Sequence, residues 1–115
     1  KENKIFFEKI TKAIDRNMNN PDFSTEHLAK ELGLSARHLY RKLKGITEQT
    51  PANLIKEYKL TVVEKLLLTS KNSVDEIMYM AGFNNRGSFY RLFSQKFGMT
   101  PKQYRETKIN EDVKW

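Results

Sequence analysis

The sequence predicts an all-α fold of about seven helices, in which two similar helical units flank one long helix. Residues 51–70 carry apolar side chains at the spacing of one helix face, whereas a strand would alternate apolar and polar positions. The stretches on either side, residues 24–51 and 73–101, resemble each other. An internal repeat of this length indicates two copies of one structural unit. The predicted architecture is therefore two tandem helix-turn-helix units joined by a linker helix.

The repeat rests on residues that keep their register in both copies. The copies align without a gap through the glycine turn, and the second copy then has one extra residue. The matched pairs are Leu28/Ile77, Gly33/Gly82, Leu34/Phe83, Leu39/Phe89, Tyr40/Tyr90, Arg41/Arg91, Leu43/Phe93 and Thr50-Pro51/Thr100-Pro101. We therefore expect the same local structure in both copies.

The first unit is predicted to contain three helices before the linker helix. Residues 4–18 have apolar side chains at helical spacing and form the first of them. Ser24 or Thr25 suits the N-cap of the second, because their hydroxyl groups accept bonds from free backbone N–H groups. That helix is expected to end at Gly33, since a left-handed residue commonly follows a helix end. The third helix follows over residues 36–44.

The second unit repeats this plan. A helix is predicted over residues 74–81, a turn at Gly82 and a second helix over about residues 86–97. This second helix has three phenylalanines that are expected to face inward, Phe89, Phe93 and Phe97. A short final helix is expected after Pro101 and is predicted to bury Tyr104.

The predicted organisation has four segments. Residues 1–50 form the N-terminal helix and the first helix-turn-helix unit, and residues 51–70 form the linker helix. Residues 71–107 form the second unit with its final short helix. Residues 108–115 show no clear period and are left as a C-terminal tail.

Composition narrows the function classes. A chain of 115 residues is one domain or two very small subdomains. Zero cysteines exclude a disulfide or thiolate framework and suit a reducing cytoplasm. Two histidines, no phosphate-cradling glycine loop and no carboxylate pair at metal-ligand spacing predict no enzyme, no metal and no cofactor. No stretch predicts a membrane span or a signal peptide.

The first residue of the sequence leads to a prediction about the full-length protein. It opens with Lys1 rather than methionine, so we expect a piece of a longer protein or a processed product. No small-molecule ligand is expected in this fragment, and any sensing domain should lie outside it.

Charge placement points to a polyanionic partner. The net charge is +7. The first helix of each helix-turn-helix carries acids, Glu26 and Glu31 in one and Asp75 and Glu76 in the other, while the second helix carries none. The basic residues of these second helices are Arg37, Arg41, Lys42 and Lys44 in the first unit and Arg86, Arg91 and Lys96 in the second. Guanidinium groups match the acceptor edge of guanine and the oxygens of phosphate. Two acid-free helices, each after a glycine turn, favour DNA binding over a merely solvated helix face.

A different class of protein remains open. The chain also suits a basic all-helical protein-interaction module whose basic faces bind an acidic partner. That alternative predicts no preference for one DNA sequence over another. RNA binding is less favoured, because most aromatic residues have core spacing rather than positions suited to stacking on bases.

The linker helix sets the expected distance between the two units. Twenty residues at about 1.5 Å each make a rod of roughly 30 Å. Successive major grooves on one side of B-DNA are about 34 Å apart. The copies are tandem and differ in sequence, so the DNA site should be asymmetric. Docking both helices is expected to bend the DNA at a cost of about 1–6 kcal/mol.

Three strings of this sequence and one spaced motif carry a resemblance to a known family. The strings are LSARHLYRKLKGITEQTPANLI, KLTVVEKLLLTS and AGFNNRGSFYRLFSQKFGMTPKQYR, and the motif of the second unit is GF-x5-F-x-R-x-F-x3-FG-x-TP-x2-YR. Over residues 23–107 the sequence resembles the AraC/XylS family of transcription regulators, for which this motif is a specific signature. The resemblance implies two helix-turn-helix units on a long helix, binding of promoter DNA in the cytoplasm and control of transcription. It also implies RNA polymerase as a second partner.

Two strings resemble one subgroup of the family more closely. They are LYRKLK and the lead-in FFEKITKAIDRNMNNPDFS, and both look like the output domain that ends hybrid two-component sensor regulators. As the output domain of such a regulator, this fragment would belong to a membrane-anchored protein. The oligomeric state is open, because tandem units let a monomer bind while regions before this fragment offer a route to dimerisation.

The resemblance also implies the residues that read the bases. In the first unit they are Arg37, His38, Tyr40 and Arg41, and in the second they are Arg86, Gly87, Ser88, Tyr90 and Arg91. Tyr40 and Tyr90 also suit surface packing, and His38 also suits incidental exposure. Phosphate contacts are expected at the helix N-termini, where free N–H groups favour an anion, and at lysines. These residues are Ser35, Thr50, Thr100, Lys44, Lys56, Lys59 and Lys96.

Three places depart from the family pattern. Glu48 stands where a glycine is often found, its counterpart being Gly98, so the turn geometry there is open. Met78 and Ala81 exchange a small and a larger residue, which we interpret as local repacking. Gly87 lowers helix propensity, and it either lets a phosphate approach or is tolerated in a first turn.

Overall fold

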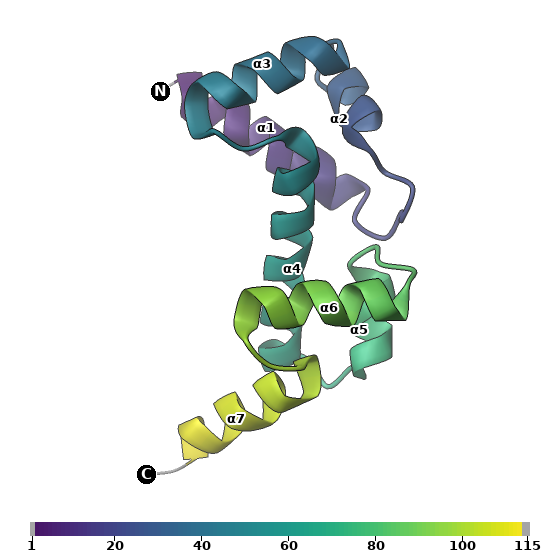
Figure 1. Ribbon diagram of the computed structural model, residues 1–115, viewed down its shortest axis with the longest axis vertical. Helices are drawn as coiled ribbons and strands as arrows, with labels where there is room; N and C mark the ends of the chain where they lie inside the picture. The colour runs from purple at the N-terminus through teal and green to yellow at the C-terminus, as the bar shows by residue number, and fades with distance from the viewer. Residues whose placement is uncertain (1, 114–115) are drawn as a thin grey trace. The chain divides into compact units, whose positions relative to one another are not determined.

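The fold is all-helical, as predicted. A computed structural model describes the backbone of residues 2–113 and the side chains of residues 2–109. Within residues 2–113 there are seven helices and no strand (Figure 1). They are α1 (Glu2–Arg16), α2 (Thr25–Glu31), α3 (Ala36–Thr47), α4 (Pro51–Thr69), α5 (Val74–Met80), α6 (Arg86–Phe97) and α7 (Pro101–Val113).

The chain forms two compact units, which divide within α4. Unit 1 comprises residues 1–58 and unit 2 comprises residues 59–115. Unit 1 therefore contains α1, α2, α3 and the first part of α4, and unit 2 contains the rest of α4 with α5, α6 and α7. The helix-turn-helix of unit 1 is α2–α3, and that of unit 2 is α5–α6.

Some helix ends differ from the predicted ranges. α1 begins at Glu2 and ends at Arg16, and α3 continues to Thr47. α7 continues to Val113, through most of the segment in which the sequence showed no period. Apolar periodicity marks the part of a helix that packs on a core, and helix ends shift by one or two residues without changing that pattern. Residues 114–115 of the predicted tail lie outside the described residues.

Unit 1 has a core in which α1 packs with α2, α3 and α4. Leu39 and Leu43 of α3, the counterparts of Phe89 and Phe93 in the repeat, are fully buried. The remaining core residues are Phe6, Ile10, Ala13, Ile14, Phe23, Leu28, Ala29 and Ile55. The Tyr58 hydroxyl of α4 donates a hydrogen bond of 2.8 Å to Asp15 Oδ1 of α1. This bond joins the first helix of the unit to the last.

This bond predicts a loss of stability at high pH. Burial first, then the hydrogen bond to Asp15 and its charge, raise the pKa of Tyr58 from 10.0 to about 12. The unfolded chain therefore loses the Tyr58 proton first, and the stabilisation present below pH 10 is lost as pH rises toward 12. We expect the free energy of unfolding of Tyr58→Phe to fall less between pH 9 and 12 than that of the wild type. Urea titrations at both pH values measure this, and parallel declines would contradict it.

Unit 2 has a core built around the aromatic residues of α6. Phe89 and Phe93 are fully buried, and Phe97 is half-buried at the edge of the same face. The Phe93 ring centroid lies 4.4 Å from that of Phe97 and 5.7 Å from that of Tyr104. Tyr104 is buried, as predicted, and its hydroxyl donates a hydrogen bond to Glu64 of α4.

The C-terminal end of α4 is capped by α7. Arg105 Nε donates a bond of 2.8 Å to the Leu67 carbonyl, and Arg105 Nη2 donates one of 3.2 Å to the Ser70 carbonyl. The last carbonyls of a helix have no partner within the helix, so these bonds satisfy them. The Tyr-Arg pair that ends the family motif therefore holds α7 on α4.

The two turns of the repeat have the same backbone geometry. Gly33 and Gly82 have φ values of 73° and 84°, in the left-handed region that favours glycine. After each glycine a backbone N–H reaches back to the helix, from Leu34 to the Ala29 carbonyl at 2.9 Å and from Phe83 to the Met78 carbonyl at 3.0 Å. Met78 is 2% exposed and Ala81 is 0% exposed, so both side chains belong to the core of unit 2.

Glu48 occupies a glycine conformation after α3. Its φ of 67° is close to the φ of 76° at Gly98, so both turns keep one geometry despite the different residues. A left-handed conformation costs a non-glycine residue about 1–2 kcal/mol, and the flexibility of glycine in the unfolded chain offsets part of this. We expect Glu48→Gly to raise the free energy of unfolding by up to about 1 kcal/mol. Urea titration measures this, and a destabilised variant would contradict the strain argument.

Candidate nucleic-acid interface

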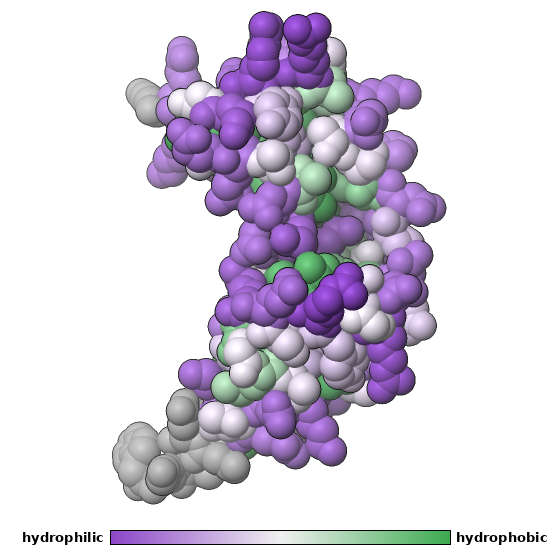
Figure 2. Space-filling view, in the orientation of Figure 1, coloured by the Kyte–Doolittle hydropathy of each residue, from purple (hydrophilic) through white to green (hydrophobic). Residues whose placement is uncertain are grey.

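α3 presents a basic face to solvent in unit 1. The Ser35 hydroxyl accepts a bond of 3.0 Å from the His38 N–H and so caps the helix. The buried side of α3 is formed by Leu39 and Leu43. The predicted base-reading residues of unit 1 are all exposed on other sides of this helix: Arg37, His38, Tyr40 and Arg41. Hydrophilic residues dominate the surface at the top of Figure 2, over α3.

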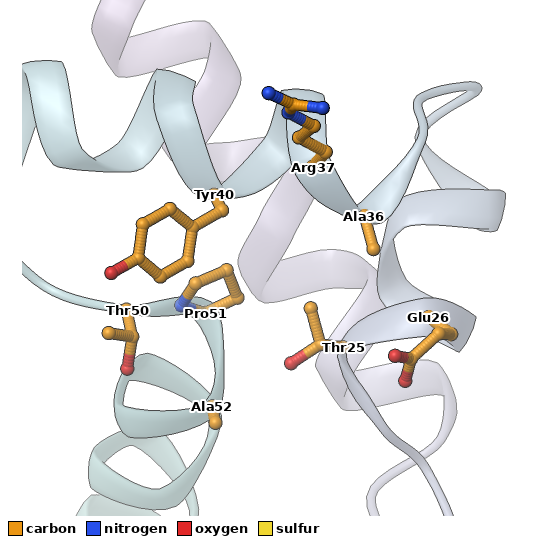
Figure 3. Close-up of a pocket in the computed structure, with 8 residues that line it drawn as sticks. All are labelled: Thr25, Glu26, Ala36, Arg37, Tyr40, Thr50, Pro51 and Ala52. Carbon is orange, nitrogen blue, oxygen red and sulfur yellow. The ribbon is translucent and has the colours of Figure 1, made fainter.

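An open pocket lies between α2, the start of α3 and the start of α4. Its volume is about 550 Å³, and Thr25, Arg37, Tyr40 and Thr50 are among its lining residues. The Tyr40 ring lies above Thr50 and Pro51 in the view of Figure 3, while the guanidinium end of Arg37 points away from them. Tyr40 is 44% exposed, so it packs only in part against unit 1.

α6 presents the corresponding face in unit 2. Asn85 caps this helix, because its Oδ1 accepts a bond of 2.8 Å from the Ser88 N–H. Arg86, Gly87 and Arg91 are exposed, while Ser88 and Tyr90 are half-buried. A Cβ atom on Gly87 would lie 3.5 Å from its nearest neighbour, Asn85 Oδ1, which is an ordinary contact. Packing inside unit 2 therefore does not require glycine at this position.

Two further residues contact Arg86. Arg86 Nη1 lies 3.5 Å from Asp75 Oδ2 of α5, and its Cζ lies 5.5 Å from the centroid of the Tyr90 ring. A hydrogen bond with the Tyr90 side chain, and then the charge of Asp75, raise the pKa of the Arg86 guanidinium above its ordinary value. Arg91 Nη2 lies 3.5 Å from the Ser88 hydroxyl, at the long limit of a hydrogen bond.

The predicted phosphate contacts at helix N-termini are also capping residues. The Thr50 and Thr100 hydroxyls each accept a bond of 3.1 Å, from the Asn53 and Gln103 N–H groups respectively. Ser35 is exposed, and both threonines are half-buried. Each cap leaves other N–H groups of its first turn without a partner in the helix.

The four predicted lysine contacts differ in exposure. Lys44 and Lys96 are exposed, and Lys56 is half-buried. Lys59 is only 6% exposed, and its Nζ lies 5.9 Å from the centroid of the Phe83 ring. Burial lowers the pKa of Lys59. The structure therefore does not support the prediction for Lys59, because an ammonium packed on Phe83 is not on the surface.

Sequence analysis missed two features of this site. Asn85 was not predicted as a cap, although asparagine before a helix is a common capping residue. The contact between Asp75 and Arg86 was also missed, because the two residues belong to different helices and no helix spacing relates them. The repeat register gave no signal either, since Arg86 corresponds to Ala36 in the first copy.

Among the described residues, no three His, Cys, Asp or Glu residues lie close enough together to hold a metal ion. A search of the same residues finds no helix that is both long and apolar enough to cross a membrane.

The fold and these faces define the class of protein as a double helix-turn-helix domain with one exposed basic helix in each unit. The profile of the helix-turn-helix domain family matches residues 28–107. The chain belongs to this family and is an AraC-type helix-turn-helix DNA-binding domain of transcription regulators. The resemblance inferred from the sequence motifs is thereby confirmed. This family is not a class of enzymes.

Curated relatives share about a third of their aligned residues with this chain. Histidine kinase P4 of Formosa agariphila is 36% identical over 96 residues, which cover 84% of this chain and 7% of that protein. The HTH-type transcriptional activator RhaS of Salmonella arizonae is 36% identical over 81 residues, which cover 70% of this chain and 29% of that protein. The chain therefore spans well under two thirds of the length of these relatives.

Solved structures share the fold. The C-terminal domain of the two-component response regulator yesN from Fusobacterium nucleatum superposes with a TM-score of 0.72 at 27% identity, covering 85% of this chain and 95% of that one. The DNA-binding domain of AdpA, in complex with a target DNA, superposes with a TM-score of 0.77 at 24% identity. That match covers 87% of this chain and 89% of that chain.

Proposed function

We propose that this chain binds double-stranded promoter DNA in a sequence-specific manner, with α3 and α6 as the two recognition helices. One observation carries the proposal: both units place a capped, acid-free helix after the same glycine turn, with its arginines exposed and its apolar side buried. A helix enters the major groove with such a face, because arginine forks pair with guanine there. The AdpA domain, which has the same fold, binds a target DNA.

The proposed interface combines base reading and backbone contacts. The base-reading residues are Arg37, His38, Tyr40 and Arg41 in α3, and Arg86, Gly87, Ser88, Tyr90 and Arg91 in α6. The backbone contacts are Ser35, Lys44, Thr50, Lys56, Lys96 and Thr100. Lys59 is left out because it is buried. The exposed Gly87 backbone has room for a phosphate or base edge to approach.

The site on DNA is proposed to be asymmetric and to span two adjacent major grooves. The reading positions differ between the copies: Arg37 corresponds to Gly87, and Ala36 to Arg86. Two different helices in one chain read two different boxes, whereas a symmetric dimer reads a palindrome. One chain therefore supplies both recognition helices without a partner subunit.

The larger protein is proposed to be a two-component regulator that acts in the cytoplasm. Its curated relatives include a histidine kinase, and its structural neighbours include C-terminal domains of response regulators. In such a protein this fragment is the output domain, RNA polymerase is its second partner and dimerisation comes from regions outside the fragment. Any small-molecule sensing belongs to those regions as well.

A selection from random DNA duplexes tests the proposal. We expect enrichment of a long, asymmetric consensus with two boxes about one helical turn apart. Titration of the enriched duplex and of a scrambled duplex across a salt series then separates specific binding from charge attraction. No enrichment, or equal loss of binding with salt for every sequence, would contradict the proposal. Either result would favour the alternative function, a basic protein-interaction module.

A further inference from the structure

Asp75 lies beside Arg86, which is proposed to read a base of the DNA. Its carboxylate is negatively charged, as DNA is. Asp75 belongs to the first turn of α5, and Arg86 is the first residue of α6. Asp75 Oδ2 lies 3.5 Å from Arg86 Nη1, and the Tyr90 ring lies 5.5 Å from Arg86 Cζ. Arg86 is thereby held by a carboxylate and an aromatic ring, from two different helices.

The carboxylate of Asp75 is oriented toward this arginine. Its other oxygen, Oδ1, is buried and has no hydrogen-bond donor among the described residues. Oδ2 is therefore the oxygen that makes the specific contact. The Asp75 and Arg86 side chains are 48% and 67% exposed, so the pair stands at the surface of unit 2 and is within reach of a ligand.

This pair is not required by the fold. In the repeat register Asp75 corresponds to Glu26, and Arg86 corresponds to Ala36. In the described part of unit 1, neither Arg37 nor Arg41 has an ion-pair partner. Unit 1 has the same glycine turn and a capped α3 after it without such a contact. An exposed ion pair also contributes little to stability.

An arginine held in this way favours one base. The guanidinium has five N–H donors in one plane, and a single carboxylate oxygen at Nη1 leaves other donors directed to solvent. Guanine offers two acceptors, O6 and N7, on its major-groove edge, and a bidentate arginine contact needs two donors aligned with them. A guanidinium fixed by Asp75 and Tyr90 loses less freedom on forming that contact than a free one.

The same carboxylate disfavours the competing contacts of Arg86. A phosphate near Arg86 also lies near Asp75, and the two negative charges repel each other. Binding of random DNA, which depends on phosphate contacts, is therefore weakened. Specificity is a difference between affinities, and a repulsive group that acts mainly on the wrong partners increases it.

We propose that Asp75 is a positioning residue that fixes Arg86 for guanine and so sets the base preference of unit 2. This inference rests on the proposed DNA-binding function. Asp75 need not contact a base, because it acts through the Arg86 guanidinium.

Asp75→Asn and Glu76→Gln form a matched pair of variants for the test. Each removes one negative charge from the first turn of α5. Glu76 contacts Ser73 in the capping box rather than Arg86, and glutamine keeps such a box. Arg86→Ala first identifies the base-pair position at which this variant no longer discriminates between bases. Both proteins are then titrated with the selected duplex and with duplexes that carry each of the other bases at that position.

The expected results separate positioning from charge. Asp75→Asn should bind random DNA more tightly and lower the preference for guanine roughly five- to tenfold. Glu76→Gln should tighten binding to all duplexes alike and leave the preference within about twofold. In the Arg86→Ala background, Asp75→Asn should no longer change the base preference, which a merely structural role of Asp75 would not predict.

Failure of this inference can be told from failure of the proposed function. A wild-type protein that selects no sequence overturns both. A wild-type protein that selects a two-box site, with an unchanged guanine preference in Asp75→Asn, overturns only the role of Asp75. An Arg86→Ala variant that keeps the full base preference of the wild type overturns it as well.

Discussion

Phe93→Ala is expected to lower the free energy of unfolding of unit 2 by about 3–5 kcal/mol. Phe93 is fully buried, and its ring lies next to those of Phe89, Phe97 and Tyr104, at centroid distances of 6.2, 4.4 and 5.7 Å. Alanine in its place removes this buried area and leaves a cavity that helical neighbours fill only in part. Because small domains are stable by only about 5–15 kcal/mol, unit 2 should become marginally folded.

A urea titration followed by NMR amide signals measures this effect separately in each unit. Phe97→Ala is the matched control, because Phe97 belongs to the same ring cluster but is half-buried. We expect its loss to be clearly smaller than that of Phe93→Ala. Equal losses would show that burial does not determine the contribution of these rings. Unit 1 should keep its transition in both variants if the two compact units unfold independently.

The architecture could be predicted from the sequence because the repeat carries redundant information. Gly33 and Gly82 each mark a turn that needs a positive φ, and both have it. Phe89 and Phe93 match Leu39 and Leu43 in register, and all four are fully buried. Each sequence pattern therefore occurs twice, and a pattern that arose by chance in one copy would not recur in the other.

The contacts of individual charged residues could not be predicted in the same way. Lys59 was read as a surface residue because lysine usually is, but α4 turns it onto Phe83. Periodicity locates the apolar face of a helix, and it does not say which long side chain bends back over that face. Asp75 and Arg86 meet only because the turn at Gly82 brings two helices together.

The exposed arginines of the proposed interface form an intermediate case. For Arg37, Arg41 and Arg91 the exposed side of the helix followed from the helical period, because the buried residues of α3 and α6 lie opposite them. The bases that they read depend on the approach of the DNA, for which the sequence of the protein holds no direct signal. A binding measurement is therefore needed to determine which bases these arginines contact.

Arg41→Ala and Arg91→Ala are each expected to weaken binding to the selected duplex by about 1–3 kcal/mol. The two arginines occupy matched positions in the repeat, and both are exposed on the side of the recognition helix away from its buried residues. If each reads a guanine, its loss removes a bidentate contact in one box only. Arg41→Ala should then relax the sequence requirement in one box, and Arg91→Ala should relax it in the other.

A lysine on another helix supplies the control. Lys12→Ala removes one positive charge from an exposed position of α1 and leaves α3 and α6 unchanged. It should weaken binding slightly and equally for all duplexes, with no change in base preference. Binding constants on duplexes mutated in each box, measured at two salt concentrations, distinguish these cases. If Arg41→Ala and Arg91→Ala weaken all sequences equally and only reduce the salt dependence, the two arginines contact phosphates and the bases are read by other residues.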